Sequence, residues 1–175
     1  LVAHECILDV RHLKASANHG SIIKVRSKAN HSGLIPIPIL GAANCGEATI
    51  FADEQIEGYI HVSSSNLPKS VKQLYFIRAV GNSMNKANVD GSNIEGGDLI
   101  LIDGRERSPK NGDYVVSVIG DVANVKKFNS DKHTGQIVLV SESSEDHPPI
   151  FIHPKDLDSY MIAGKVIRVF KTPKQ

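Results

Sequence analysis

Residues 96–128, GGDLILIDGRERSPKNGDYVVSVIGDVANVKKF, decide the fold class of this chain. Three runs rich in β-branched and other apolar residues lie inside them, at 99–102, 114–119 and 122–128. Turn-forming residues separate these runs, at 103–104, 108–112 and 120–121. Short apolar runs divided by Gly, Pro, Asn and Asp are typical of β-strands joined by tight turns. The stretch therefore predicts consecutive antiparallel strands.

The same pattern extends outward in both directions. Further strand-like runs occupy 58–62, 74–80, 137–140, 150–152 and 161–170. Many short strands at close spacing, with one short helical turn at most after Met84, favour an all-β domain of mainly antiparallel, twisted sheets. We expect this domain to occupy residues 35–175.

Residues 1–34 have a different character. Scattered histidines and bases and small polar residues replace the alternating pattern, and we interpret the segment as a linker or flexible tail. A short helix near residues 7–14 is the one element expected in it. The packed helices of a helix-turn-helix domain do not fit here. Any binding of DNA would then need a domain absent from this chain.

Composition narrows the functional classes. The 175 residues are 41% hydrophobic and 22% charged, with 20 Lys plus Arg against 19 Asp plus Glu, so no net charge drives binding to nucleic acid or anionic membrane. No apolar run approaches the roughly 20 residues that span a bilayer. Two cysteines are too few for a secreted disulfide framework, so a cytoplasmic location is expected. His4, Cys6 and His12 lack the paired spacing of a zinc site, and no metal or cofactor is expected.

One candidate nucleophile stands where a predicted strand is broken. The run 74–80 ends at Gly81-Asn82, and Ser83 follows directly. The end of a strand fixes the backbone, while the break exposes a hydroxyl and the neighbouring amides. A serine in such a place is more often an ordinary turn residue, so this pattern by itself does not decide its role.

Two adjacent lysines lie in the predicted strand 122–128. Side chains alternate between the faces of a strand, so Lys126 shares a face with Asn124 and Phe128, and Lys127 lies on the other face. Burial favours the uncharged form of an amine, which is the form that acts as a base. The alternation leaves open which lysine points inward, and paired lysines are usually solvated.

Small residues surround a third candidate, Cys45-Gly46 within GAANCGE at 41–47. Small side chains let an extended segment lie close against an active-site wall, and glycine lets the backbone turn sharply. A flexible loop with an incidental cysteine is the simpler interpretation. A Cys45 nucleophile would need a histidine partner, and His61, the nearest, has no recognisable motif around it.

Taken in order, these segments resemble the self-cleaving peptidase domain of LexA, UmuD and the phage CI-type repressors, from about residue 35 to 170. The matching pieces are IPILGAANCGEA, IEGYIHV, YFIRAVGNSM, GGDLILID, NGDYVVSVI, VANVKKF and IAGKVIRVF. The resemblance implies a LexA C-terminal or signal-peptidase-like fold. It also implies that Ser83 is the nucleophile, Lys126 the general base and Cys45–Gly46 the bond that is cut. Backbone amides of Asn82 and Ser83 are then the expected oxyanion donors.

The resemblance carries expectations about partners as well. Family members dimerise through this domain, which would involve the strand around 164–170, and are stimulated by the RecA filament on single-stranded DNA after DNA damage. A repressor fragment is favoured over a UmuD-like accessory protein of a translesion polymerase. Two other interpretations stay open: a dimerisation module that does not cleave, and a signal-peptidase-like enzyme acting on other chains.

Overall fold

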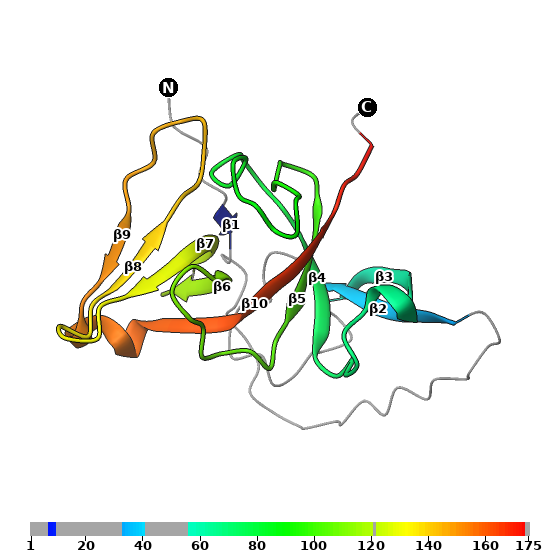
Figure 1. Cartoon of the computed structure of the whole chain (residues 1–175), viewed down its shortest axis with the longest axis horizontal. Helices are drawn as coiled ribbons and strands as arrows, with labels where there is room; N and C mark the ends of the chain where they lie inside the picture. The colour runs from blue at the N-terminus through cyan, green and yellow to red at the C-terminus, as the bar shows by residue number, and fades with distance from the viewer. Residues whose placement is uncertain (1–6, 10–32, 41–55, 121, 174–175) are drawn as a thin grey trace.

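The computed structural model describes residues 7–9, 33–40, 56–120 and 122–173 (Figure 1). The strands, in chain order, are β1 (Ile7–Asp9), β2 (Leu34–Leu40), β3 (Ile56–Ser63), β4 (Leu74–Arg78), β5 (Leu99–Asp103), β6 (Tyr114–Ile119), β7 (Val122–Ser130), β8 (Ile137–Val140), β9 (Ile150–Ile152) and β10 (Tyr160–Phe170). Two short 3₁₀ helices accompany them, η3 (Ser64–Asn66) and η4 (Pro154–Ser159). Each strand predicted between residues 58 and 170 coincides with or overlaps one of these strands.

The described strands form one ten-stranded sheet. Its order is β3-β2-β4-β5-β10-β6-β7-β8-β9, with β1 paired to β7 outside that path. β2 and β4 are parallel, and the other pairs are antiparallel. The all-β, mainly antiparallel fold class predicted from the sequence is therefore confirmed.

β10 holds the two halves of the sheet together. Its first half pairs with β6 and its second half with β5, and the register shifts near Gly164 where the partner changes. In Figure 1 this strand runs through the middle of the molecule, with β2 and β3 on one side and β8 and β9 on the other. Gly164 lets the neighbouring backbone come close, because a Cβ there would lie 2.7 Å from the carbonyl oxygen of Asp103.

Replacing Gly164 with alanine is expected to lower the free energy of unfolding by about 3 kcal/mol, because backbone atoms must move to admit the methyl group. Gly58→Ala is the matched control, since a Cβ at this strand position meets nothing within 4 Å. Denaturant unfolding measures both variants. Equal stability of the two would contradict the close approach at Gly164.

Two features of the N-terminal part differ from expectation. Ile7–Asp9 forms β1, so the helix expected near residues 7–14 is wrong at these positions, because the edge of β7 at Val122–Asn124 gives the segment a pairing partner. Residues 10–32 lie outside the described residues. Leu34–Leu40 forms a strand although prolines occupy positions 36 and 38, and it pairs with β3 from Leu34 to Leu40, with a register shift between Ile39 and Leu40. A proline has no backbone N–H to donate to a neighbouring strand. In keeping with this, the pairing of β2 with β4, on its other edge, consists of one residue pair, Ile39 opposite Phe76.

The core explains why the central strands are so apolar. β4 and β5 are buried on both faces along nearly their whole length, which requires a continuous apolar run in place of alternation. The largest cluster of buried side chains packs residues of β4, β5, β6, β7 and β10 against Met84, Ala87, Val89 and Ile94. The loop that follows β4 is thus anchored in the core.

Candidate active site

Ser83 is held by the loop that follows β4. After the strand ends, Ala79 still exchanges backbone hydrogen bonds with the 97–98 turn, donating to Asp98 at 2.8 Å and accepting from Gly97 at 2.9 Å. Gly81 then adopts φ = 77°, a left-handed conformation that a residue with a side chain rarely takes. The chain reverses there and turns Ser83 inward, where it is 0% exposed.

Lys126 reaches Ser83 from the other half of the sheet. It lies on β7 opposite Val115 of β6 and is 2% exposed. Its Nζ is 2.9 Å from Ser83 Oγ, a hydrogen-bond distance that joins residues 43 positions apart. The structure therefore brings together, inside the core, the hydroxyl and the amine that the sequence suggested.

Lys127 has a different environment. Its Nζ lies 2.6 Å from a carboxylate oxygen of Glu142 and 5.8 Å from the centre of the Tyr114 ring, and its side chain is 32% exposed. The hydrogen bond with Glu142 raises the pKa of Lys127, which keeps this lysine protonated at neutral pH. Of the two adjacent lysines, Lys126 is the one beside Ser83.

Glu142 and Tyr114 extend this polar network. Burial acts to raise the pKa of Glu142, but hydrogen bonds from Lys127 and Tyr114 outweigh it and leave that pKa below its ordinary value. Burial raises the pKa of Tyr114, whose hydroxyl donates to Glu142 and accepts the backbone N–H of Asn88 at 2.9 Å. No sequence pattern indicates this network, because Glu142 belongs to an irregular segment with no motif.

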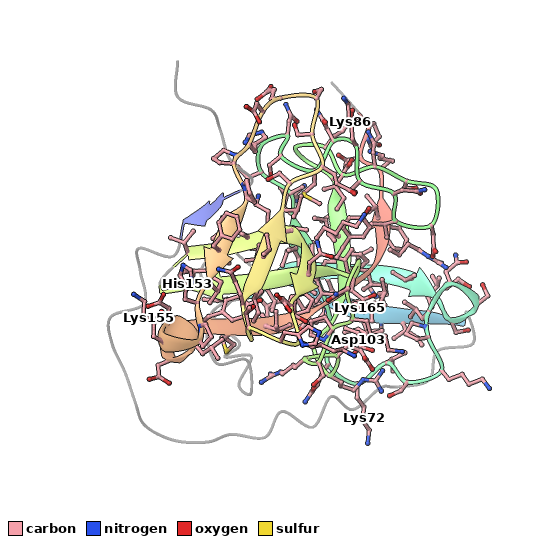
Figure 2. All side chains as sticks on the ribbon, turned by 60° about the vertical axis from the view of Figure 1, so that its left-hand side comes forward. Lys72, Lys86, Asp103, His153, Lys155 and Lys165 are labelled. Atoms are coloured by element: carbon pink, nitrogen blue, oxygen red, sulfur yellow. The ribbon has the colours of Figure 1, made fainter. Side chains whose placement is uncertain are left out.

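Residues Glu142–Ser144, here the clamp segment, hold the Ser83 loop, defined as residues 82–88. Lys86 N–H donates to the Glu142 carbonyl at 2.8 Å, and the Ser143 hydroxyl donates to the Asn82 carbonyl at 3.0 Å. Ser144 and Asn85 exchange two hydrogen bonds, both 2.8 Å long. Figure 2 shows Lys86 at the end of the molecule where the Ser83 loop and the connection from β8 to β9 meet.

Two other sequence candidates, Cys45 and Gly46, lie outside the described residues, so the structure does not place them. His61 is exposed on β3, opposite Pro36 of β2. Within the part of the chain that the structure describes, no group of three or more His, Cys, Asp or Glu side chains forms a metal site. No helix among those same residues is long and apolar enough to span a membrane.

A buried serine–lysine pair in an all-β domain is an arrangement found in serine peptidases in which a lysine takes the place of the histidine base. The chain belongs to the Peptidase S24-like family, whose model matches residues 38–167. This match contains both members of the pair and most of the described sheet.

Related proteins share this part of the sequence. The chain is 28% identical to a LexA repressor of Clostridium kluyveri over 159 residues, which is 91% of this chain and 71% of that protein. It is 31% identical to one of Cellvibrio japonicus, covering 91% of this chain and 76% of the relative. For one of Anaeromyxobacter sp. the identity is 32%, over 79% of this chain and 55% of the relative.

Proposed function

We propose that this chain is the self-cleaving peptidase domain of a LexA- or CI-like transcriptional repressor, and that it cuts its own Cys45–Gly46 bond. The observation that carries the proposal is the 2.9 Å contact between the buried Lys126 Nζ and Ser83 Oγ. The S24 family match and the relatives named LexA repressor support the same class.

Burial supplies the physical reason for the choice of base. Lys126 as a residue is 2% exposed, and burial of this kind disfavours the charged form of an amine. Two side chains on the same face of the sheet as Lys126 are buried and apolar: Phe128, two residues along β7, and Val115, opposite on β6. In this proposal the neutral Lys126 amine removes the proton from Ser83 as the hydroxyl attacks.

The proposed reaction has two steps, formation of an acyl-enzyme and its hydrolysis. Ser83 Oγ bonds to the carbonyl carbon of Cys45, and the amides of Asn82 and Ser83 stabilise the oxyanion. The C–N bond to Gly46 then breaks, and the Lys126 ammonium gives its proton to the departing amine of Gly46. Water, deprotonated by Lys126, attacks the acyl-enzyme, which frees the Cys45 carboxylate and restores the Ser83 hydroxyl.

Control of cleavage comes from docking of the segment that contains the bond. Residues 41–55 connect Leu40 to Ile56, which are paired across β2 and β3, so the segment is tethered at both ends. Enzyme and substrate are one chain, and the effective concentration is therefore high whenever the segment docks. A partner that favours the docked state accelerates cutting.

The expected partners follow from the family. In this proposal the RecA filament on single-stranded DNA stimulates docking in the cytoplasm after DNA damage, the domain forms homodimers, and DNA is bound only through a domain outside this chain. Cleavage then ends repression. Co-sedimentation with RecA filaments, with and without single-stranded DNA, tests the first of these partners.

Self-cleavage is expected to accelerate as the pH is raised from 7 to 10, by up to about tenfold per pH unit until the base is fully neutral, because only the uncharged amine can accept the proton. Mass spectrometry of the purified chain, sampled over time at each pH, measures the rate and finds the new N-terminus at Gly46.

Two outcomes contradict this proposal in different ways. A rate that is flat over the same pH range argues against an amine as the base. A chain that stays whole at every pH, yet dimerises, supports the dimerisation module that does not cleave. A cut at another bond moves the scissile site away from Cys45–Gly46.

A further inference from the structure

The carbonyl of Asn82, which immediately precedes Ser83, is held from two sides. It accepts the Asn85 backbone N–H at 3.1 Å and the Ser143 hydroxyl at 3.0 Å. The first bond closes a turn within the Ser83 loop, and the second comes from the clamp segment, 61 residues further along the chain. Local turn geometry accounts for the first bond alone.

The hydroxyl of Ser143 has a fixed orientation. Its oxygen accepts the backbone N–H of Glu145 at 3.1 Å while its proton goes to the Asn82 carbonyl. The flanking contacts of the clamp segment, Glu142 with Lys86 and Ser144 with Asn85, keep Ser143 in register with its acceptor. A donor that is itself anchored restrains its partner more firmly than a freely rotating hydroxyl.

We propose that Ser143 is a positioning residue that orients the backbone N–H of Ser83, one of the two oxyanion donors of the proposed reaction. A peptide unit is planar and trans, so its C=O and N–H point in opposite directions from one rigid plane. The carbonyl of Asn82 and the N–H of Ser83 belong to the same unit. Fixing the carbonyl therefore fixes the direction in which the N–H donates.

This inference rests on the proposed function, and it concerns only the oxyanion side of the site. The base reaches Ser83 from β7, whereas Ser143 contacts the peptide unit before Ser83. Loss of the Ser143 hydroxyl should loosen the donor without changing the titration of Lys126. Preorganised donors act because they need no rearrangement as charge develops, so a loosened donor slows the reaction.

The experiment compares self-cleavage rates of Ser143→Ala, Ser143→Thr, Ser143→Val, Ser141→Ala and Ser83→Ala in the full chain, from pH 7 to pH 10. Thr and Val have the same shape and differ in the hydroxyl, so their comparison cancels the packing change even if Ser143→Ala folds poorly. Ser141→Ala is the matched control, since among the described contacts its side chain makes no hydrogen bond to the Ser83 loop. Thermal melting of each variant monitors the fold.

We expect Ser143→Ala and Ser143→Val to cleave about tenfold more slowly than Ser141→Ala at every pH, with an unshifted pH profile, and Ser143→Thr to recover most of the rate. Equal rates for the Thr and Val variants, or a shifted pH profile, overturn the positioning role. If Ser83→Ala cleaves as fast as the unaltered chain, the proposed function fails first, which is a distinct result.

Discussion

Replacing Lys126 with alanine is expected to slow self-cleavage by about 10²–10⁴-fold at pH 9, because the proposed general base is lost while the proposed nucleophile, Ser83, remains in place. The reason is the 2.9 Å distance from Nζ to Ser83 Oγ, together with the burial of both side chains. The time course of the Gly46 N-terminus by mass spectrometry measures the loss. Added small amines should restore part of the rate if the cavity left by the side chain admits them.

Lys127→Ala is the control that makes this result specific. Lys127 lies next along the same strand, but its partner is Glu142 and its pKa is raised, so it is protonated under the assay conditions. Its removal should change the rate by about threefold or less, through the Glu142 network alone. An equal loss for the two lysine variants would leave the base unassigned and count against Lys126.

Ser83→Ala is expected to abolish self-cleavage, with a loss on the order of 10⁴-fold or more, because Ser83 Oγ is the atom that forms the acyl intermediate in the proposed reaction. The fold should tolerate the change, since alanine is smaller than serine and fits in the same place. Mass spectrometry after prolonged incubation at pH 10 should find the chain intact.

Ser117→Ala is the matched control for the serine. Ser117 is also 0% exposed, but it lies on β6 with its hydroxyl 3.3 Å from that of Tyr160. This variant should cleave at nearly the rate of the unaltered chain, and its thermal stability shows what loss of a buried hydroxyl costs by itself. If Ser83→Ala still cleaves and Ser117→Ala does not, the nucleophile is Ser117 and not Ser83.

The strands that could be predicted are those with simple causes. β5, β6 and β7 are short apolar runs ended by Gly, Asn or Pro turns, and local chemistry of this kind is visible in one sequence. β2 is harder to predict from the sequence, because Pro36 and Pro38 lack the backbone N–H groups that donate hydrogen bonds in a strand. Its pairing with β3, from Leu34 opposite Ser63 to Leu40 opposite Ile56, is a tertiary contact that overrides that local signal.

The candidate site divides in the same way. Ser83 and Lys126 can be predicted from the sequence, because a serine after a strand break and a lysine within a strand match a family pattern. Strand alternation alone does not show which of Lys126 and Lys127 points inward. What distinguishes the two lysines is Glu142, in the irregular connection between β8 and β9, which accepts a hydrogen bond from Lys127. No hydrophobic periodicity predicts the contacts of the clamp segment with the Ser83 loop, since both segments are irregular and meet only after folding.

The path of β10 has a consequence for when the molecule can react. Ser83 follows β4, on one side of β10 in the sheet, and Lys126 lies on β7, on the other side. Neither side contains a complete reactive pair, and β10 is the strand that joins them. If the pair reacts as proposed, a nascent or partly melted chain cannot cut itself, because Ser83 and Lys126 come together only when the whole sheet has formed.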